Sequence, residues 1–184
     1  MSTFRPLCAQ REGPTGVTGV NDFCEDFVKS AFKVPSADDM YNGKVIIVRQ
    51  NDSGLGVANG DVAIIFGLKT ADSDKPTWYA FIGDLKKIVP AQLLPKYDTA
   101  FAITIHQSQG SGFRDVAIFL PTLSAGSDAA SLCTRELLYT GITRSEKTCQ
   151  IFGAKDVLGM SLKTVTQRSG GLPQRLKERF SEQG

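Results

Sequence analysis

The segment that decides the fold reads Thr104-Ile-His-Gln-Ser-Gln-Gly-Ser-Gly-Phe113. It follows an apolar run that predicts a buried strand, and it brings a hydroxyl, the only histidine of the chain, amides and glycines to the point where that strand ends. Glycine lets a backbone turn tightly and approach a ligand closely. The pattern therefore predicts a strand followed by a polar turn that can present donors to a phosphate.

A second segment, Glu136-Leu-Leu-Tyr-Thr-Gly-Ile-Thr-Arg144, predicts a helix over residues 135–145 that starts at Thr134 and ends in an arginine. Each segment alone has a simple structural explanation. A threonine and a histidine after a strand are common polar edge residues, and an arginine after a helix complements the helix dipole. Their occurrence together, in this order and context, favours a functional pair.

The two segments together resemble motifs V and VI of superfamily-1 helicases, and the sequence around them is similar to the RecD-like family, which includes the alpha subunit of exodeoxyribonuclease V. The resemblance implies a RecA-like lobe of the P-loop NTPase type. It also implies an ATP-dependent 5′-to-3′ DNA helicase that acts in double-strand break repair and recombination. The implied partners are single- and double-stranded DNA and RecB- and RecC-like subunits.

By the same resemblance, Arg144 is the expected arginine finger, because a guanidinium stays charged and its planar fork meets two phosphate oxygens at once. Gln109 and Gly110 are expected to approach ATP. Arg11 matches a motif IV arginine that would contact a second phosphate oxygen, although a solvated loop arginine explains it equally well.

Thr104 and His106 match positions that contact single-stranded DNA in this family. For His106 the alternative is a structural hydrogen bond that holds the turn. Arg49, Asn51 and Asp52 lie in a further RecD-like stretch, where they could contact DNA or a neighbouring subunit.

The sequence lacks two parts of a complete motor. It contains no G-x-x-x-x-G-K-[S/T] phosphate loop and no Asp-Glu pair after an apolar strand. We therefore expect a fragment that is inactive alone, with ATP and Mg²⁺ bound mainly by an absent first lobe. The chain also has Gly112 where the family usually has a glutamate, so that contact is either lost or made by another group.

A change of hydrophobic period predicts the domain organisation. After Gly43, short β-branched or aromatic runs at 44–49, 61–68, 76–82 and 87–89 alternate with turn residues. Residues 43–97 are therefore predicted to form a small all-β, SH3-like barrel. This barrel interrupts a RecA-like α/β domain made of residues 1–42 and 98–165, and residues 166–184 form a C-terminal tail.

Within the α/β part, the apolar pattern predicts further elements. Strands are expected at 4–9, 97–105, 115–120 and 148–153, the last two of them buried. A helix is expected from Val20, with Asn21 or Asp22 at its start, and another over 154–164. Residues 122–131 are predicted to be a surface loop.

The composition is that of a globular protein, with 41% hydrophobic and 22% charged residues and a formal charge of +2, which by itself says nothing of nucleic acid. Four cysteines without a C-x-x-C pair predict reduced thiols of a cytoplasmic protein without a zinc site. Two other functions remain open. One is a stand-alone nucleic-acid or protein-binding module with a relic motor lobe, and the other is a hydrolase using His106, which lacks an orienting acid.

Overall fold

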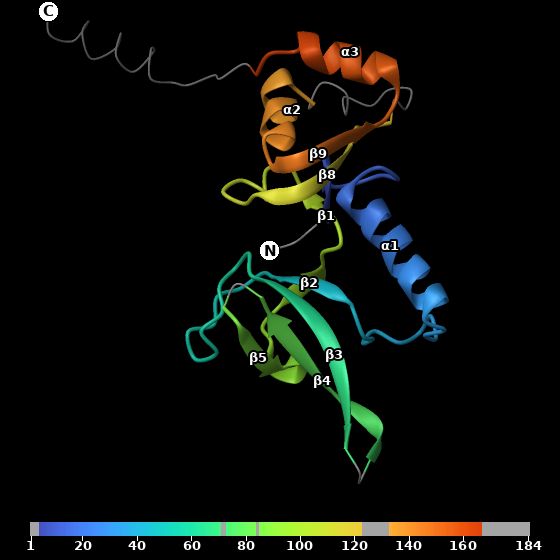
Figure 1. Ribbon diagram of the computed structural model, residues 1–184, viewed down its shortest axis with the longest axis vertical. Coiled ribbons are helices and arrows are strands. Elements are labelled where there is room, and N and C mark those ends of the chain that lie inside the picture. Colours follow the sequence, from blue (N-terminus) through green and yellow to red (C-terminus); the bar gives the residue numbers. More distant parts are fainter. Residues whose placement is uncertain (1–3, 71–72, 84, 123–132, 167–184) are drawn as a thin grey trace, which may run out of the picture.

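The computed structural model describes residues 4–70, 73–83, 85–122 and 133–166. The elements in chain order are β1 (Phe4–Cys8), α1 (Val17–Ala31), β2 (Val45–Val48), β3 (Val62–Thr70), β4 (Ser73–Ile82), β5 (Lys87–Pro90), the 3-10 helix η1 (Ala91–Leu93), β6 (Tyr97–Thr99), β7 (Ile103–Thr104), β8 (Phe113–Phe119), α2 (Arg135–Ile142), β9 (Ser145–Phe152) and α3 (Lys155–Lys163). The strands form two separate sheets, one parallel and one antiparallel (Figure 1).

The parallel sheet has the strand order β7-β1-β8-β9, so β1 is flanked on both sides. Leu7 pairs with Ile103 on one side and with Ile118 on the other. Successive residues of a strand point to opposite faces, so Leu7 packs in the same cluster as Leu138 of α2, and Cys8 packs with Val20 of α1. Helices therefore cover both faces, which confirms the predicted α/β layer.

The antiparallel sheet has the order β5-β4-β3-β2-β6 and occupies the other end of the molecule (Figure 1). Its own core includes Ile46, Ile65 and Ile82, each fully buried. The chain enters this sheet after α1 and leaves it after β6, so the antiparallel sheet lies in sequence between β1 and β7 of the parallel sheet. None of the described helices is long and apolar enough to cross a membrane.

The single strand predicted over 97–105 is wrong. Residues 97–99 pair with β2 in the antiparallel sheet, and residues 103–104 pair with β1 in the parallel sheet. Residues 100–102 turn between the two sheets. An apolar run that stays buried while passing from one sheet to another looks like one continuous strand in sequence.

Three other predictions need correction. Helix α1 begins at Val17, before the predicted start, because loop carbonyls of Gln10 and Arg11 accept its first amides. Helix α2 ends at Ile142 rather than at residue 145. Strand β9 lies at the edge of the sheet and is mostly exposed, not buried. Of the predicted 122–131 loop and 166–184 tail, all but residues 122 and 166 lie outside the described ranges.

The N-terminus of α2 is fastened to the segment after α3. The hydroxyl of Thr134 accepts a hydrogen bond from the amide of Leu137, so Thr134 caps the helix as predicted. One carboxylate oxygen of Glu136 accepts from the amide and the hydroxyl of Thr166, both at 2.9 Å. The hydrogen bonds from the Thr166 amide, the Glu136 amide and the Thr166 hydroxyl lower the pKa of Glu136 to about 2.

This contact predicts a pH dependence of stability. A carboxyl whose folded-state pKa is lowered stabilises the fold above its ordinary pKa, and the contribution is lost as the pH falls toward the folded-state value. Glu136→Gln should therefore reduce the fall of the thermal midpoint between about pH 5 and pH 2, as followed by circular dichroism. Thr166→Val keeps the amide donor and should remove only part of the effect. Identical pH profiles for wild type and Glu136→Gln would contradict it.

Candidate nucleotide and nucleic-acid interface

The turn after β7 is held by side chains at its own start. The backbone amide and the hydroxyl of Thr104 both donate to the side-chain oxygen Oε1 of Gln107 at 3.1 Å. The backbone amide of Gln107 donates back to the Thr104 hydroxyl at 3.1 Å. Ser108, which is fully buried, donates to the Ile105 carbonyl at 2.7 Å. Gly110 has φ +87°, a conformation that favours glycine. The turn is therefore ordered before any ligand arrives.

The remaining side chains of the turn face solvent. His106 and Gln109 are exposed. Within the described ranges, neither side chain has a hydrogen-bond partner. Thr104, in contrast, is only 7% exposed and its hydroxyl is engaged by Gln107. His106 and Gln109 are thus available to a ligand, whereas Thr104 shapes the turn.

The arginine at the end of α2 lies against this turn. Nη1 of Arg144 donates to the Ser111 carbonyl at 3.2 Å, and Nε donates to the Thr140 carbonyl at 3.3 Å. The Arg144 carbonyl also accepts from the Phe113 amide at 2.8 Å, where β8 begins. The structure therefore brings Arg144 to the turn that carries Gln109 and Gly110.

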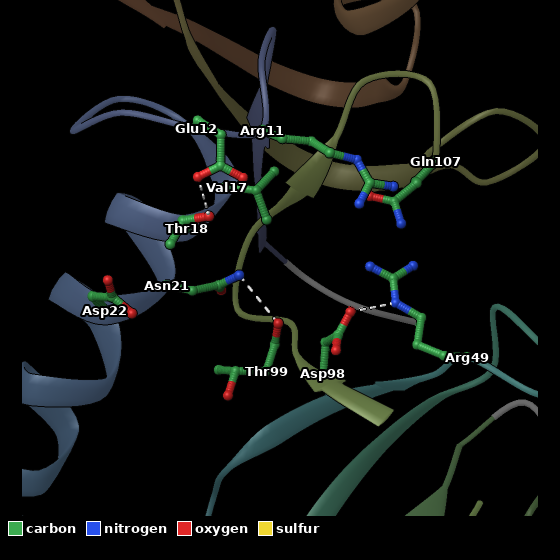
Figure 2. A pocket seen from close by; sticks show the side chains of 10 residues that line it. All are labelled: Arg11, Glu12, Val17, Thr18, Asn21, Asp22, Arg49, Asp98, Thr99 and Gln107. Carbon is green, nitrogen blue, oxygen red and sulfur yellow. Dashed lines mark hydrogen bonds and ion pairs between the residues drawn. The ribbon is translucent and has the colours of Figure 1, made fainter. Parts of the chain in front are cut away.

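Arg11 lies in an open cleft of about 210 Å³ between the two sheets. Gln107 of the turn and Arg49, which follows β2, also line this cleft, and Figure 2 shows the ends of all three side chains turned toward one another. Gln109, Gly110 and Arg144 do not line it. The predicted nucleotide contacts are therefore divided, with Arg11 in the cleft and the others at the far end of the turn.

Two glycines fix the loop that carries Arg11. A Cβ on Gly16 would come within 2.6 Å of the Arg11 carbonyl, and a Cβ on Gly19 would come within 2.6 Å of the Gly13 carbonyl. Such distances to backbone atoms leave no room for a side chain. The loop therefore packs directly on the first turns of α1, which sets the position from which Arg11 reaches the cleft.

The segment of residues 98–102, here called the connector, joins the antiparallel sheet to β7. The side chain of Asn21, which is 6% exposed, donates to the carbonyls of Thr99 and Ala102 at 3.1 and 3.2 Å and accepts from the Ala102 amide at 2.8 Å. From β1, Arg5 donates to the Ala100 carbonyl at 2.9 Å, and burial lowers the pKa of its guanidinium. The connector is therefore held by both a helix and a strand.

Glu25 adds a charged group to the contact between α1 and the connector. It accepts from the Thr99 hydroxyl at 3.2 Å and pairs with Lys29 at 3.3 Å and Lys44 at 3.5 Å. Burial alone would raise the pKa of Glu25, but the charges of Lys44 and Lys29, with hydrogen bonds from Lys29 and Thr99, lower it. Lys44 comes from the start of the antiparallel sheet, so both ends of that sheet are tied to α1.

Comparison with known proteins identifies the lobe. The UvrD-like helicase C-terminal domain matches residues 99–151, which include the turn and α2. The RecBCD enzyme subunit RecD of Mycolicibacterium smegmatis is 34% identical over 177 residues, which cover 96% of this chain and 30% of that protein. The chain is thus similar to the C-terminal helicase lobe of RecD proteins. The RecD subunit of Mycobacterium tuberculosis (strain H37Rv) is 32% identical over 181 residues, with 96% and 29% covered.

Solved helicases share the fold of this lobe. The Bacteroides Pif1 helicase in complex with ADP-AlF3 and single-stranded DNA has a TM-score of 0.55 at 14% identity, covering 98% of this chain and 46% of that one. Bacteroides Pif1 bound to single-stranded DNA has a TM-score of 0.50 at 16% identity, with 97% and 46% covered. The parallel sheet is thus that of a RecA-like helicase lobe. The chain spans about 30% of the length of its RecD relatives.

Sequence reasoning missed two residues of this helicase lobe. Gln107 was overlooked, although its position three residues after Thr104 matches the spacing at which a side chain reaches back to a capping residue. Asn21 was taken for a helix start, whereas it lies within α1, is buried and bonds the connector. Nothing local in sequence distinguishes these roles for an asparagine at the start of a helix.

In this helicase lobe a carboxylate lies beside Gly112, the position at which the family usually has a glutamate. A Cβ on Gly112 would lie 3.2 Å from a carboxylate oxygen of Glu146 on β9. A carboxylate therefore stands next to the position, supplied by the neighbouring strand. The contact of the family's glutamate was expected to be either lost or made by another group. This geometry favours the second alternative, with Glu146 as that group.

Proposed function

We propose that this chain is the C-terminal motor lobe of a cytoplasmic, ATP-dependent 5′-to-3′ DNA helicase of the RecD type. Its complete form would act with RecB- and RecC-like subunits in double-strand break repair and recombination. The observation that carries the proposal is the contact of Arg144 with the turn at Ser111, because it joins the two helicase motifs in one site. The 34% identity to a RecBCD subunit over 96% of the chain supports the family's activity over a relic lobe.

In this proposal ATP binds between this lobe and a preceding one. The donors that this lobe offers are the Gln109 side chain, the backbone amide of Gly110 and the Arg144 guanidinium. Such preorganised donors stabilise the charge that develops on the transferred phosphoryl group. The described residues contain no group of three or more His, Cys, Asp or Glu side chains arranged for a metal, and Mg²⁺ would be held by the preceding lobe, as the family resemblance implies.

The proposed contact to single-stranded DNA is made by His106, whose exposed side chain has no partner among the described residues. Thr104 would act on the DNA indirectly, through the shape of the turn, because its hydroxyl is engaged by Gln107. Arg11 was expected at the nucleotide. Its position in the cleft beside Arg49 and Gln107 favours a contact with nucleic acid instead.

We propose further that the antiparallel sheet is an SH3-like module. Four of its strands form a meander, the fifth pairs back with the first, and the 3-10 helix η1 precedes that last strand. The division proposed is a RecA-like part of residues 1–42 and 98–165, a module of residues 43–97 and a tail of residues 166–184. The pairing of β6 with β2 favours moving the second boundary to the end of β6, after Thr99.

Unwinding assays on the complete protein test this function. With ATP it should unwind a duplex that has a 5′ single-stranded tail and leave one with a 3′ tail intact. The 184-residue chain alone should not hydrolyse ATP. Unwinding from the 3′ tail would contradict the polarity, and a complete protein without DNA-stimulated ATP hydrolysis would contradict the motor function.

A further inference from the structure

Helix α1 carries two phenylalanines that its own sheet does not cover. Phe23 is 72% exposed and Phe27 is 66% exposed. They are four residues apart, the spacing that places side chains next to each other on one side of a helix. Since one phenylalanine presents roughly 150–250 Å², the pair leaves an apolar patch of roughly 200–350 Å². A patch of this size approaches the largest that a typical monomer exposes, which is often functional.

The patch continues the face by which α1 packs on the parallel sheet. Cys24, which directly follows Phe23, packs with Val20 and with Cys8 of β1. Successive residues of a helix point about 100° apart, so Phe23 lies beside the covered face and not opposite to it. The apolar face of α1 is therefore wider than the part that the sheet covers. Figure 1 shows α1 along one side of the molecule, and the uncovered part is accessible there.

Acidic residues border the patch. Asp22 and Asp26 are four residues apart and exposed, and Asp26 is also a neighbour of Phe23, three residues before it. Neither carboxylate has an ion-pair partner among the described residues. Lys29, the only basic residue of α1, pairs with Glu25 instead. Like charges at this spacing destabilise a helix, and a positively charged partner would remove the repulsion.

These charges decide which kind of partner fits the patch. The phosphates of a nucleic acid and the headgroups of an anionic lipid surface would be repelled by the two carboxylates. A second copy of the same helix face would bring like charges together, which disfavours association. A protein groove with an apolar floor and basic edges matches both the phenylalanines and the carboxylates. Such grooves are an ordinary way of binding an amphipathic helix.

We propose that the outer face of α1 docks into an apolar groove edged by lysine or arginine on another protein subunit. This docking face consists of Phe23, Phe27, Asp22 and Asp26. The phenylalanines fill the groove as anchors, and the carboxylates pair with its edges. The inference rests on the proposed function, because the subunit belongs to the proposed complex. The docking face is separate from Arg144, since α1 and α2 cover opposite faces of the parallel sheet.

Biolayer interferometry of the complete protein against purified RecB- and RecC-like subunits tests the inference. Phe23→Ala and Phe27→Ala should each weaken binding about tenfold, and the double variant about a hundredfold, because buried aromatic anchors dominate such contacts. Alanine is the best helix former and both side chains are exposed, so the thermal midpoint should stay unchanged. DNA-stimulated ATP hydrolysis should also be unchanged.

Two controls are matched in residue type. Phe32 is 73% exposed but follows the end of α1, and it points about 140° away from Phe27 around the helix axis. Phe32→Ala should therefore leave binding unchanged. Asp26→Asn should weaken binding about two- to fivefold and reduce its salt dependence, because one charge pair at the edge of the groove is lost. Asp156→Asn, at an exposed acid in the first turn of α3, should change neither.

The first set of outcomes concerns the variants. Equal affinity of wild type and the double phenylalanine variant would overturn the docking face and leave the motor function, which unwinding tests, standing. An equal loss in Phe32→Ala would reduce the effect to general apolar surface and also overturn it. Equal affinity and salt dependence of wild type and Asp26→Asn would overturn the basic edges of the groove.

The second set concerns other occupants of the docking face. A dimer of the complete protein in light scattering, lost in Phe23→Ala, would assign the face to a second copy and overturn the inference. A Phe27→Cys variant that resists a maleimide before the subunits are added would assign the face to another part of the same polypeptide, with the same consequence. A wild-type protein that binds neither subunit would overturn both the docking face and the proposed complex, while unwinding would still decide the motor function.

Discussion

Replacing Arg144 by alanine is expected to slow ATP hydrolysis by the complete motor about 10³- to 10⁵-fold. This loss corresponds to about 4–7 kcal/mol of activation free energy. Among the residues that the structure describes, the guanidinium has only carbonyl partners, at Ser111 and Thr140, so none of them neutralises its charge before the phosphoryl group arrives. Turnover should be measured as phosphate release at saturating ATP and single-stranded DNA.

Two variants make that result specific. Arg144→Lys keeps the positive charge but not the planar fork, and it should recover little of the rate. Arg135→Ala removes the same residue type from the opposite, exposed end of α2 and should leave turnover unchanged. Normal turnover in Arg144→Ala would exclude the arginine-finger role, and an equal loss in Arg135→Ala would point to damage of the helix.

Asn21→Ala is expected to lower the free energy of unfolding by about 2–5 kcal/mol, because it leaves several buried backbone groups without partners. The groups that lose a partner are the Ala102 amide and the carbonyls of Thr99 and Ala102. Urea denaturation followed by tryptophan fluorescence gives the size of the effect. Hydrogen exchange should locate it, with faster exchange in the connector and β7 than in β3 and β4.

Thr18→Ala is the matched control on the same helix. Its hydroxyl makes one exposed hydrogen bond, to Glu12 at 3.4 Å, so its loss should change stability by less than about 0.5 kcal/mol. A stable Asn21→Ala protein with unchanged exchange at Ala102 would show that the connector does not depend on this side chain.

Local chemistry accounts for what sequence could predict. Thr134 caps α2 through its own hydroxyl, and the turn at 104–110 follows from a buried strand that ends in small polar residues and glycine. The antiparallel strands alternate with turn residues at short range. All of these signals lie within a few residues of the feature they determine. The meeting of Arg144 with that turn was expected from the motifs, but the roles of the site residues stay predictions.

Long-range contacts account for what sequence could not predict. Asn21 bonds residues 78 and 81 positions away, and Arg5 bonds one 95 positions away. The run from Tyr97 to Thr104 reads as one strand because Thr99 to Ile103 are all apolar or β-branched, whereas residues 97–99 pair with β2 and residues 103–104 pair with β1. Arg49 was noticed only as a possible contact, since its orientation depends on Asp98, which returns to its side from the end of the sheet.

The hydrogen bonds that hold the connector have a mechanical consequence. A module on a flexible tether would absorb load by bending, but here a helix and a strand both hold the five residues that lead from the antiparallel sheet to the turn. A force on the antiparallel sheet would therefore be transmitted through the connector to the turn after β7.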